Sequence, residues 1–112
     1  MKLVVLETPY AGDVERNIAF ALDCLRDCLL RGEAPFASHL LYARGALNDQ
    51  DLDERELGIA AGLEWGLLAT KTVAYVNLGI SEGMKRGVAR ATEEGRPVEY
   101  RELMPAQKRG KW

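Results

Sequence analysis

Short runs of β-forming residues alternate with longer helical patterns along the chain, and this alternation constrains the fold more than any other feature of the sequence. Turn residues such as Gly12, Gly32 and Pro97 mark the changes of pattern. In chain order, we expect strands and helices alternately at 2–7, 14–30, 35–38, 53–69, 73–76, 81–95 and 98–101. Helices that connect successive strands make right-handed crossovers, which place the strands parallel in a sheet that is covered on both faces.

This element order predicts an α/β, flavodoxin-like three-layer sandwich with a parallel four-stranded sheet in the order 2-1-3-4. The apolar runs at 2–7 and 73–76 are continuous rather than alternating, which is typical of central strands. Pro35 opens the run at 35–38, and the run at 98–101 alternates, so these two strands are expected at the edges. In open α/β sheets, ligands bind at the carboxyl ends of the strands where the order switches, here between the first and third strands.

One domain accounts for the 112 residues. We expect it to span residues 1–102, with residues 103–112 forming a flexible tail or an arm that docks on a partner through Trp112. The net charge of −2 predicts no general attraction to nucleic acid or to anionic membranes. The sequence contains no apolar run of about 18 residues, so we expect no transmembrane helix. The apolar N-terminal run is too short for a signal peptide. The cytoplasm is therefore the expected compartment.

The cysteines and the histidine argue against a metal site. Cys24 and Cys28 lie four residues apart on one helical face, a spacing typical of packing residues rather than of a redox or zinc pair. His39 is the only histidine, which excludes a zinc site with several histidines. We expect no metal and no cofactor.

Two helical faces carry predictions about packing. In the first helix, a stripe that should face the sheet consists of Ile18, Leu22, Leu25 and Leu29. In the second helix, Gly58, Gly62 and Gly66 form a row at spacing four. Glycine costs roughly 1 kcal/mol per helical position relative to alanine, so the row indicates a close approach. Its partner is either the chain's own sheet or helices, or a second subunit.

The stretch 72–91 predicts a buried strand, a turn and a helix. Asn77, Gly79 and Ser81 interrupt the apolar run, and the helical spacing resumes with Met84. A helix that starts directly after a strand presents free backbone N–H groups, which suit an anion such as a phosphate. A plainer interpretation is that Ser81 caps the helix and the glycines shape a tight turn. The predicted crevice also includes Tyr10, Gly12 and Asp13 after the first strand, with Ser38 and His39 beside it.

Four segments resemble a known group of proteins: 8–17 (TPYAGDVERN), 34–42 (APFASHLLY), 54–65 (ERELGIAAGLEW) and 78–84 (LGISEGM). They are similar to the nucleoside 2-deoxyribosyltransferase-like superfamily, and more closely to small uncharacterised bacterial and phage proteins of that fold. The resemblance implies a nucleoside or nucleotide pocket lined by Tyr10. It also implies that the turn with Ser81, Glu82 and Gly83 holds the sugar or its 5′-phosphate, and that the chains form homo-oligomers.

The resembled enzymes carry a glutamate nucleophile near the start of this helix, which forms a glycosyl-enzyme intermediate. Here Lys85 stands at that place, and neither Arg86 nor Gly87 is a carboxylate. Lys85 and Arg86 either strengthen binding of an anion or form a solvated helix face. The candidate catalytic carboxylates are therefore Glu82, Asp13 and Glu7, each of which also has an ordinary structural role.

The expected ligand-binding residues are Tyr10, Gly12, His39, Asn77, Gly79, Ser81, Gly83 and Met84. We expect the protein to bind a nucleoside or nucleotide at the carboxyl ends of the first and third strands, without the usual nucleophilic glutamate. One alternative is an N-glycosidase or deoxyribosyltransferase that acts on a (deoxy)nucleoside or its 5′-phosphate. Another is a non-catalytic oligomeric assembly protein or one that sequesters nucleotides.

Overall fold

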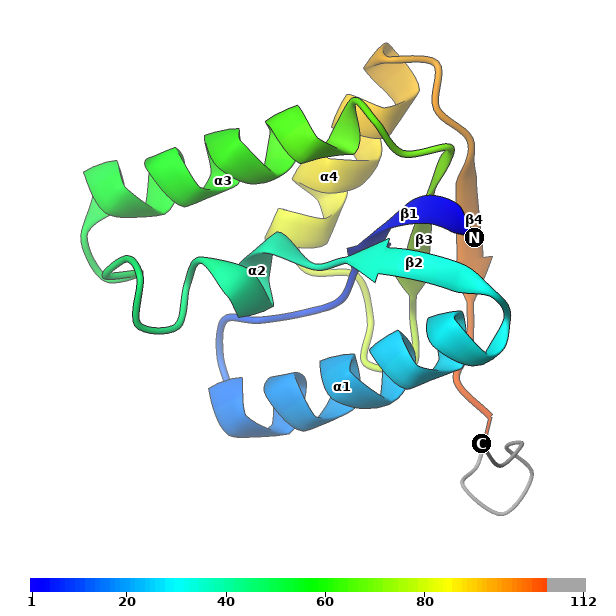
Figure 1. Cartoon of the computed structure of the whole chain (residues 1–112). Coiled ribbons are helices and arrows are strands. Elements are labelled where there is room, and N and C mark those ends of the chain that lie inside the picture. Colours follow the sequence, from blue (N-terminus) through cyan, green and yellow to red (C-terminus); the bar gives the residue numbers. More distant parts are fainter. Residues whose placement is uncertain (105–112) are drawn as a thin grey trace.

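The computed structural model describes residues 1–104, in which a four-stranded parallel sheet is covered by helices on both faces (Figure 1). Its elements in chain order are β1 (Lys2–Glu7), α1 (Val14–Leu30), β2 (Glu33–Phe36), α2 (Ser38–Leu41), α3 (Leu52–Gly66), β3 (Lys71–Tyr75), α4 (Glu82–Glu93) and β4 (Val98–Arg101). The strand order is β2-β1-β3-β4, and every neighbouring pair is parallel. The predicted fold class and strand order are confirmed.

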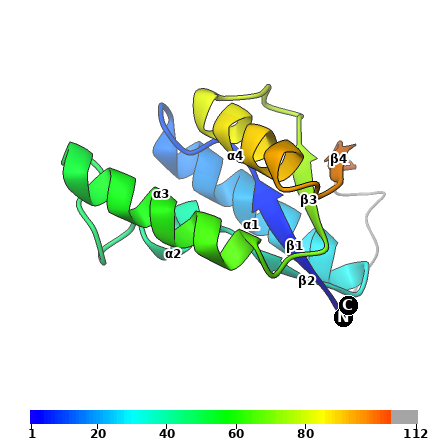
Figure 2. The same ribbon diagram turned by 90° about the horizontal axis from the view of Figure 1, so that it is seen from above.

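Helix α1 lies on one face of the sheet, whereas α3 and α4 lie on the other, as the two orthogonal views show (Figures 1 and 2). No helix within residues 1–104 is long and apolar enough to cross a lipid bilayer. The predicted tail falls mostly on residues 105–112, which lie outside the described residues. Leu103, at its start, packs against the core.

Several element boundaries differ from the expectation, and β3, for example, runs over Lys71–Tyr75 rather than 73–76. Strand β2 runs from Glu33 to Phe36 rather than over 35–38, because Glu33 already pairs with Lys2 of β1. The short helix α2 follows directly and was not predicted, since four residues leave no helical periodicity to detect. Helix α3 ends at Gly66 rather than at residue 69.

The prediction for the buried face of α1 was wrong in part, since Ile18 and Leu25 are half-buried and Leu25 packs against the core, whereas the other two residues of the stripe are exposed. Leu22 of the leucine stripe is 54% exposed, and Leu29 is also exposed. The buried residues of this helix are instead Asn17, Ala21, Cys24 and Cys28. Small side chains let the helix axis approach the sheet closely, and this packing outweighs the greater apolar area of the leucines. The two cysteines are fully buried in the core, as expected of packing residues.

The glycine row of α3 packs against the chain itself. A Cβ atom at Gly62 would lie 2.6 Å from the Cβ of Ser38 in α2, and one at Gly58 would lie 3.1 Å from Leu47 Cδ1. The close approach that the row indicates is therefore made to α2 and to the segment that follows it. This face is not available to a second subunit.

A buried ion-pair network connects the start of β2 to β4, the last strand. The guanidinium of Arg101 donates two parallel hydrogen bonds to Glu33, at 2.7 and 2.6 Å. Lys71 Nζ lies 3.0 Å from the same carboxylate. The hydrogen bonds from Arg101 lower the pKa of Glu33 to about 2, although burial acts in the opposite direction. The network therefore holds the edge strand β2 to β4 across the sheet.

We predict that Arg101→Met destabilises the fold by about 3–5 kcal/mol, because it leaves the buried Glu33 carboxylate without its main partner. The side chains of Arg101 and Glu33 are only 5% and 7% exposed. Urea unfolding at neutral pH measures the change. The double variant Arg101→Met/Glu33→Leu should recover part of the loss.

The matched control is Lys85→Met, which breaks the exposed ion pair with Glu82. Its cost should be no more than about 1 kcal/mol, since exposed pairs contribute little. An equally small effect of Arg101→Met would contradict the role given to the buried network.

Candidate functional site

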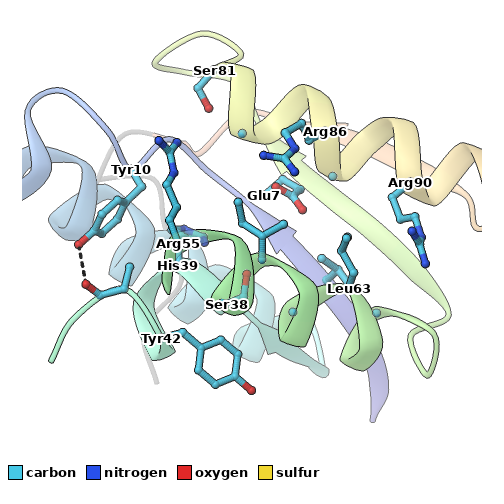
Figure 3. A pocket seen from close by; sticks show the side chains of 18 of the residues that line it. Glu7, Tyr10, Ser38, His39, Tyr42, Arg55, Leu63, Ser81, Arg86 and Arg90 are labelled. Carbon is cyan, nitrogen blue, oxygen red and sulfur yellow. Dashed lines mark hydrogen bonds between the residues drawn. The ribbon is translucent and has the colours of Figure 1, made fainter. Parts of the chain in front are cut away.

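A cavity of about 580 Å³ lies between α3 and α4, above the carboxyl end of β1 (Figure 3). Its walls combine the end of β1 and the segment after it, α2 and the segment after it, α3, and α4 from its first to its last turn. Apolar side chains form much of its inner surface: Val5, Phe36, Leu47, Ile59 and Leu63. The cavity thus lies on the face of the sheet opposite α1, next to the predicted switch between β1 and β3.

The structure brings six of the predicted site residues to this cavity: Glu7, Tyr10, His39, Ser81, Glu82 and Gly83. The other five do not line it: Gly12, Asp13, Asn77, Gly79 and Met84. Asp13 caps α1 by accepting a hydrogen bond from the Arg16 N–H, and Met84 is buried in the core. The side-chain amide of Asn77 bonds to the backbone of Leu103. These five residues therefore have structural contacts or positions away from the cavity.

The three candidate carboxylates have different environments. The Glu82 side chain is 89% exposed and forms an ion pair with Lys85 at 3.1 Å. Asp13 is exposed at the start of α1. Glu7, the last residue of β1, is the one that combines burial with a place in the cavity wall.

The Glu7 carboxyl lies against α4 at Gly87. A Cβ atom at position 87 would overlap the carboxyl atoms of Glu7, so only glycine leaves room for it there. No hydrogen bond or ion pair to this carboxyl is found within residues 1–104. Burial raises the pKa of Glu7 from 4.5 to about 8, while the positive charge of Arg96 acts in the opposite direction. Glu7 is therefore mostly protonated at neutral pH.

His39 is the second titratable group in the cavity wall. Its Nε2 atom lies 2.7 Å from Thr8 Oγ1, so one of the two donates a hydrogen bond to the other. The ring of Tyr10 lies edge-on to the imidazole, with 6.2 Å between the ring centroids. Burial lowers the pKa of His39 to about 4. This side of the cavity is therefore aromatic and uncharged at neutral pH.

The start of α4 forms the opposite side. Ser81 Oγ accepts a hydrogen bond from the Met84 N–H at 3.2 Å, which makes Ser81 the N-cap of the helix. The capping interpretation is thus correct for this side chain, which also lines the cavity. The first N–H groups of a helix have no partner within the helix, so Glu82 and Gly83 present donors at the cavity.

Four arginines line the cavity: Arg55, Arg86, Arg90 and Arg96. Arg86 of α4 forms two contacts of 3.3 Å with Glu56 of α3, and both side chains are largely exposed. Arg96 is committed to the Gly66 carbonyl, Thr72 Oγ1 and Glu94. The cations at the start of α4 therefore remain accessible to an anion from solvent.

Sequence reasoning missed Arg55, Arg90 and the apolar wall residues of α3. Their spacing could have indicated them, because Arg55, Ile59 and Leu63 recur every four residues and so share one helix face. Arg86 and Arg90 do the same on α4. The contact between Glu7 and Gly87 has no such signal, since the two residues are far apart in the chain.

The sheet order and the helices on both faces define an α/β three-layer fold, which can be compared with solved structures. A similar solved structure is the 2-deoxyribosyltransferase from the psychrotolerant bacterium Bacillus psychrosaccharolyticus, with a TM-score of 0.60 and 18% sequence identity. The match covers 88% of this chain and 70% of that enzyme. At this identity, the likeness establishes the fold. No curated protein matches the sequence.

The chain belongs to the family described as a domain of unknown function, DUF7768, whose model matches residues 2–101.

We predict that Glu7→Gln stabilises the protein, and more so as pH rises. Between its unfolded value near 4.5 and its folded value near 8, Glu7 binds more protons in the folded state. The free energy of unfolding therefore falls with rising pH in this window, and glutamine removes this contribution. Urea unfolding of both proteins from about pH 5 to pH 8.5 should show a widening difference. Glu82→Gln, at an exposed position, should show a constant one; a constant difference for Glu7→Gln would refute the assignment.

Proposed function

We propose that the protein binds a nucleoside or nucleotide in the cavity between α3 and α4. The observation that carries the proposal is the cavity's two-sided chemistry: an aromatic, uncharged wall faces a helix start flanked by arginines. A volume of about 580 Å³ is within the range of small-molecule sites. The structurally similar protein is a 2-deoxyribosyltransferase, which supports the same class of ligand.

The two walls suit different parts of such a ligand. Tyr10 and the neutral His39 are suited to the base or sugar, through ring contacts and hydrogen bonds. The N–H groups of Glu82 and Gly83, with Arg86 nearby, suit a 5′-phosphate. A nucleotide would then lie across the cavity with its phosphate toward α4.

A second candidate function is cleavage or transfer at the glycosidic bond, and Glu7 favours it. This carboxyl combines a place in the cavity wall with partial burial and freedom from other hydrogen bonds among the described residues. A protonated carboxyl is suited to donate a proton to the departing base rather than to attack the sugar. The activity would therefore use Glu7 in place of a glutamate on α4.

Self-association is a further proposal, for which exposed apolar side chains of α3 offer area. Leu57 is 62% exposed and Trp65 is 53% exposed, and neither is part of the glycine row. Light scattering at high protein concentration should give a mass above that of one chain. A monomeric mass would refute self-association without affecting ligand binding.

Binding is tested by calorimetric titration with the four common deoxynucleosides and their 5′-monophosphates. Gly83→Val should weaken binding of the monophosphates by about tenfold or more, because the added side chain would block the phosphate from the N–H groups at the helix start, and loss of one charge-assisted contact costs about 1.5–3 kcal/mol. Binding of the nucleosides should change less. Thr92→Ala, on the exposed face of the same helix, is the matched control.

If no nucleoside or nucleotide binds, the proposed function is wrong. If Gly83→Val weakens the binding of nucleosides and of monophosphates equally, the phosphate binds elsewhere. Chromatography of the same mixtures for free base tests the second function. Base release that persists unchanged in Glu7→Gln would exclude Glu7 from the reaction.

A further inference from the structure

Glu7 and Gly87 form an interlocked pair at the cavity wall. Glu7 ends the central strand β1, and its carboxyl occupies the volume that a side chain at position 87 of α4 would need. Figure 3 shows Glu7 beside α4, with Arg86 and Arg90 on the same helix. Because the carboxyl is the end of a flexible side chain, a side chain at position 87 would displace it from this place rather than move either backbone.

This carboxyl reaches the cavity with unused hydrogen-bonding capacity. It makes no hydrogen bond within residues 1–104, although a protonated carboxyl offers one donor and further acceptor positions. No fully buried side-chain oxygen among the described residues lacks a partner, so the Glu7 oxygens are accessible from the cavity, where a ligand could replace solvent as their partner. A ligand that supplies the missing partner would therefore gain affinity at this point.

The charged groups around the cavity leave Glu7 without a neutralising partner. The cations that line the cavity are Arg55 from α3, Arg86 and Arg90 from α4, and Arg96 before β4. The other carboxyls that line it are Asp49 and Glu54 on the α3 side and Glu82 and Glu93 on α4.

The remaining groups are the phenols of Tyr10 and Tyr42 and the imidazole of His39 on the α2 side. Arg96 acts on Glu7 electrostatically, but its guanidinium bonds to Gly66, Thr72 and Glu94 instead. His39 has a pKa of about 4 and keeps one charge state above pH 6.

We propose that Glu7 binds the ligand as a neutral carboxylic acid that donates a hydrogen bond to an uncharged acceptor on the base or sugar, and that Gly87 positions it there. This inference rests on the proposed nucleoside site and adds the orientation in which the ligand lies there. The uncharged part of the ligand faces Glu7, and any phosphate lies away from it, because a phosphate would meet an acceptor-rich group that repels it on ionisation.

Ionisation of Glu7 then removes the donor and weakens binding. With a folded pKa of about 8, the neutral fraction at about pH 9 is roughly a tenth of that at about pH 6.5. The affinity should therefore fall by about tenfold between these two pH values. Raising the pH should weaken the binding of nucleosides and of monophosphates to the same extent, since both classes of ligand use the contact with Glu7.

The experiment is calorimetric titration of the four common deoxynucleosides at about pH 6.5 and about pH 9, with wild type and Glu7→Gln. Glutamine keeps a hydrogen-bond donor and does not ionise. The affinity of Glu7→Gln for nucleosides should therefore be close to that of wild type at the lower pH, and it should be the same at the higher pH as at the lower. The ratio of the two proteins' dissociation constants cancels any ionisation of the base itself. This ratio should change by about tenfold between the two pH values.

Gly87→Ala tests the positioning role. Its Cβ atom would overlap the carboxyl, so nucleoside affinity should fall by about tenfold or more at the lower pH. Thr92→Ala on the exposed face of α4 should bind as wild type does. Thermal unfolding of each variant confirms that it is folded before titration.

Two outcomes would overturn the inference and are distinguishable from failure of the proposed function. If wild type binds nucleosides with the same affinity at both pH values, or if Glu7→Gln shows the same decline, Glu7 is not the donor while nucleoside binding stands. If Gly87→Ala binds like wild type, Gly87 does not position the carboxyl. If wild type binds no nucleoside at either pH, both the site and the role of Glu7 are wrong.

Discussion

The structure depends on the central position of β1, which is hydrogen-bonded to β2 on one side and to β3 on the other. Since both neighbours are parallel to it, the carboxyl ends of all three strands lie at the same edge of the sheet. The chain leaves β1 there toward α1, while β3 leads to α4 on the opposite face (Figure 2). This divergence opens space above the end of β1, and the cavity occupies it. Glu7, Thr8 and Tyr10 reach the cavity because they follow one another at this point.

Small residues set how closely the helices approach this sheet. Ala21, Cys24 and Cys28 bring α1 against one face, and glycines perform the same role on α3 and α4. Gly62 admits Ser38 of α2, and Gly87 admits the carboxyl of Glu7. The loss of apolar area at these positions is offset by the close packing that it permits. The two glycine contacts also shape the cavity, since each brings a polar side chain to its wall.

The resulting electrostatic pattern separates an uncharged interior from a charged rim. Burial keeps Glu7 protonated and His39 neutral near pH 7, because the charged form of each would lose its hydration. The arginines of α3 and α4 lie nearer to solvent, where Arg86 pairs with Glu56. By contrast, the buried pair of Arg101 and Glu33 joins the last residue of β4 to the first residue of β2 and maintains the edge strand. The buried ion pair that supports the fold and the arginines that line the cavity are thus separate charged clusters.

The sequence by itself determined the fold class, the strand order and the edge of the sheet at which the cavity lies. Those features follow from the alternation of strands and helices and from the handedness of their connections, and both are local properties of the chain. Tyr10, His39 and Ser81 could be placed in the site for the same reason, since each directly follows a strand or starts a helix.

Only the tertiary structure decided which face of α1 is buried and which of the candidate carboxyls is buried in the cavity wall. The buried face of α1 depends on how closely the helix can approach the sheet, which the apolar stripe of leucines does not reveal. The choice among Glu7, Asp13 and Glu82 depends on burial, and burial of Glu7 requires the absence of a side chain at Gly87. That relation joins residues eighty positions apart, and its physical basis is the exclusion of overlapping atoms, which no local pattern of the sequence records.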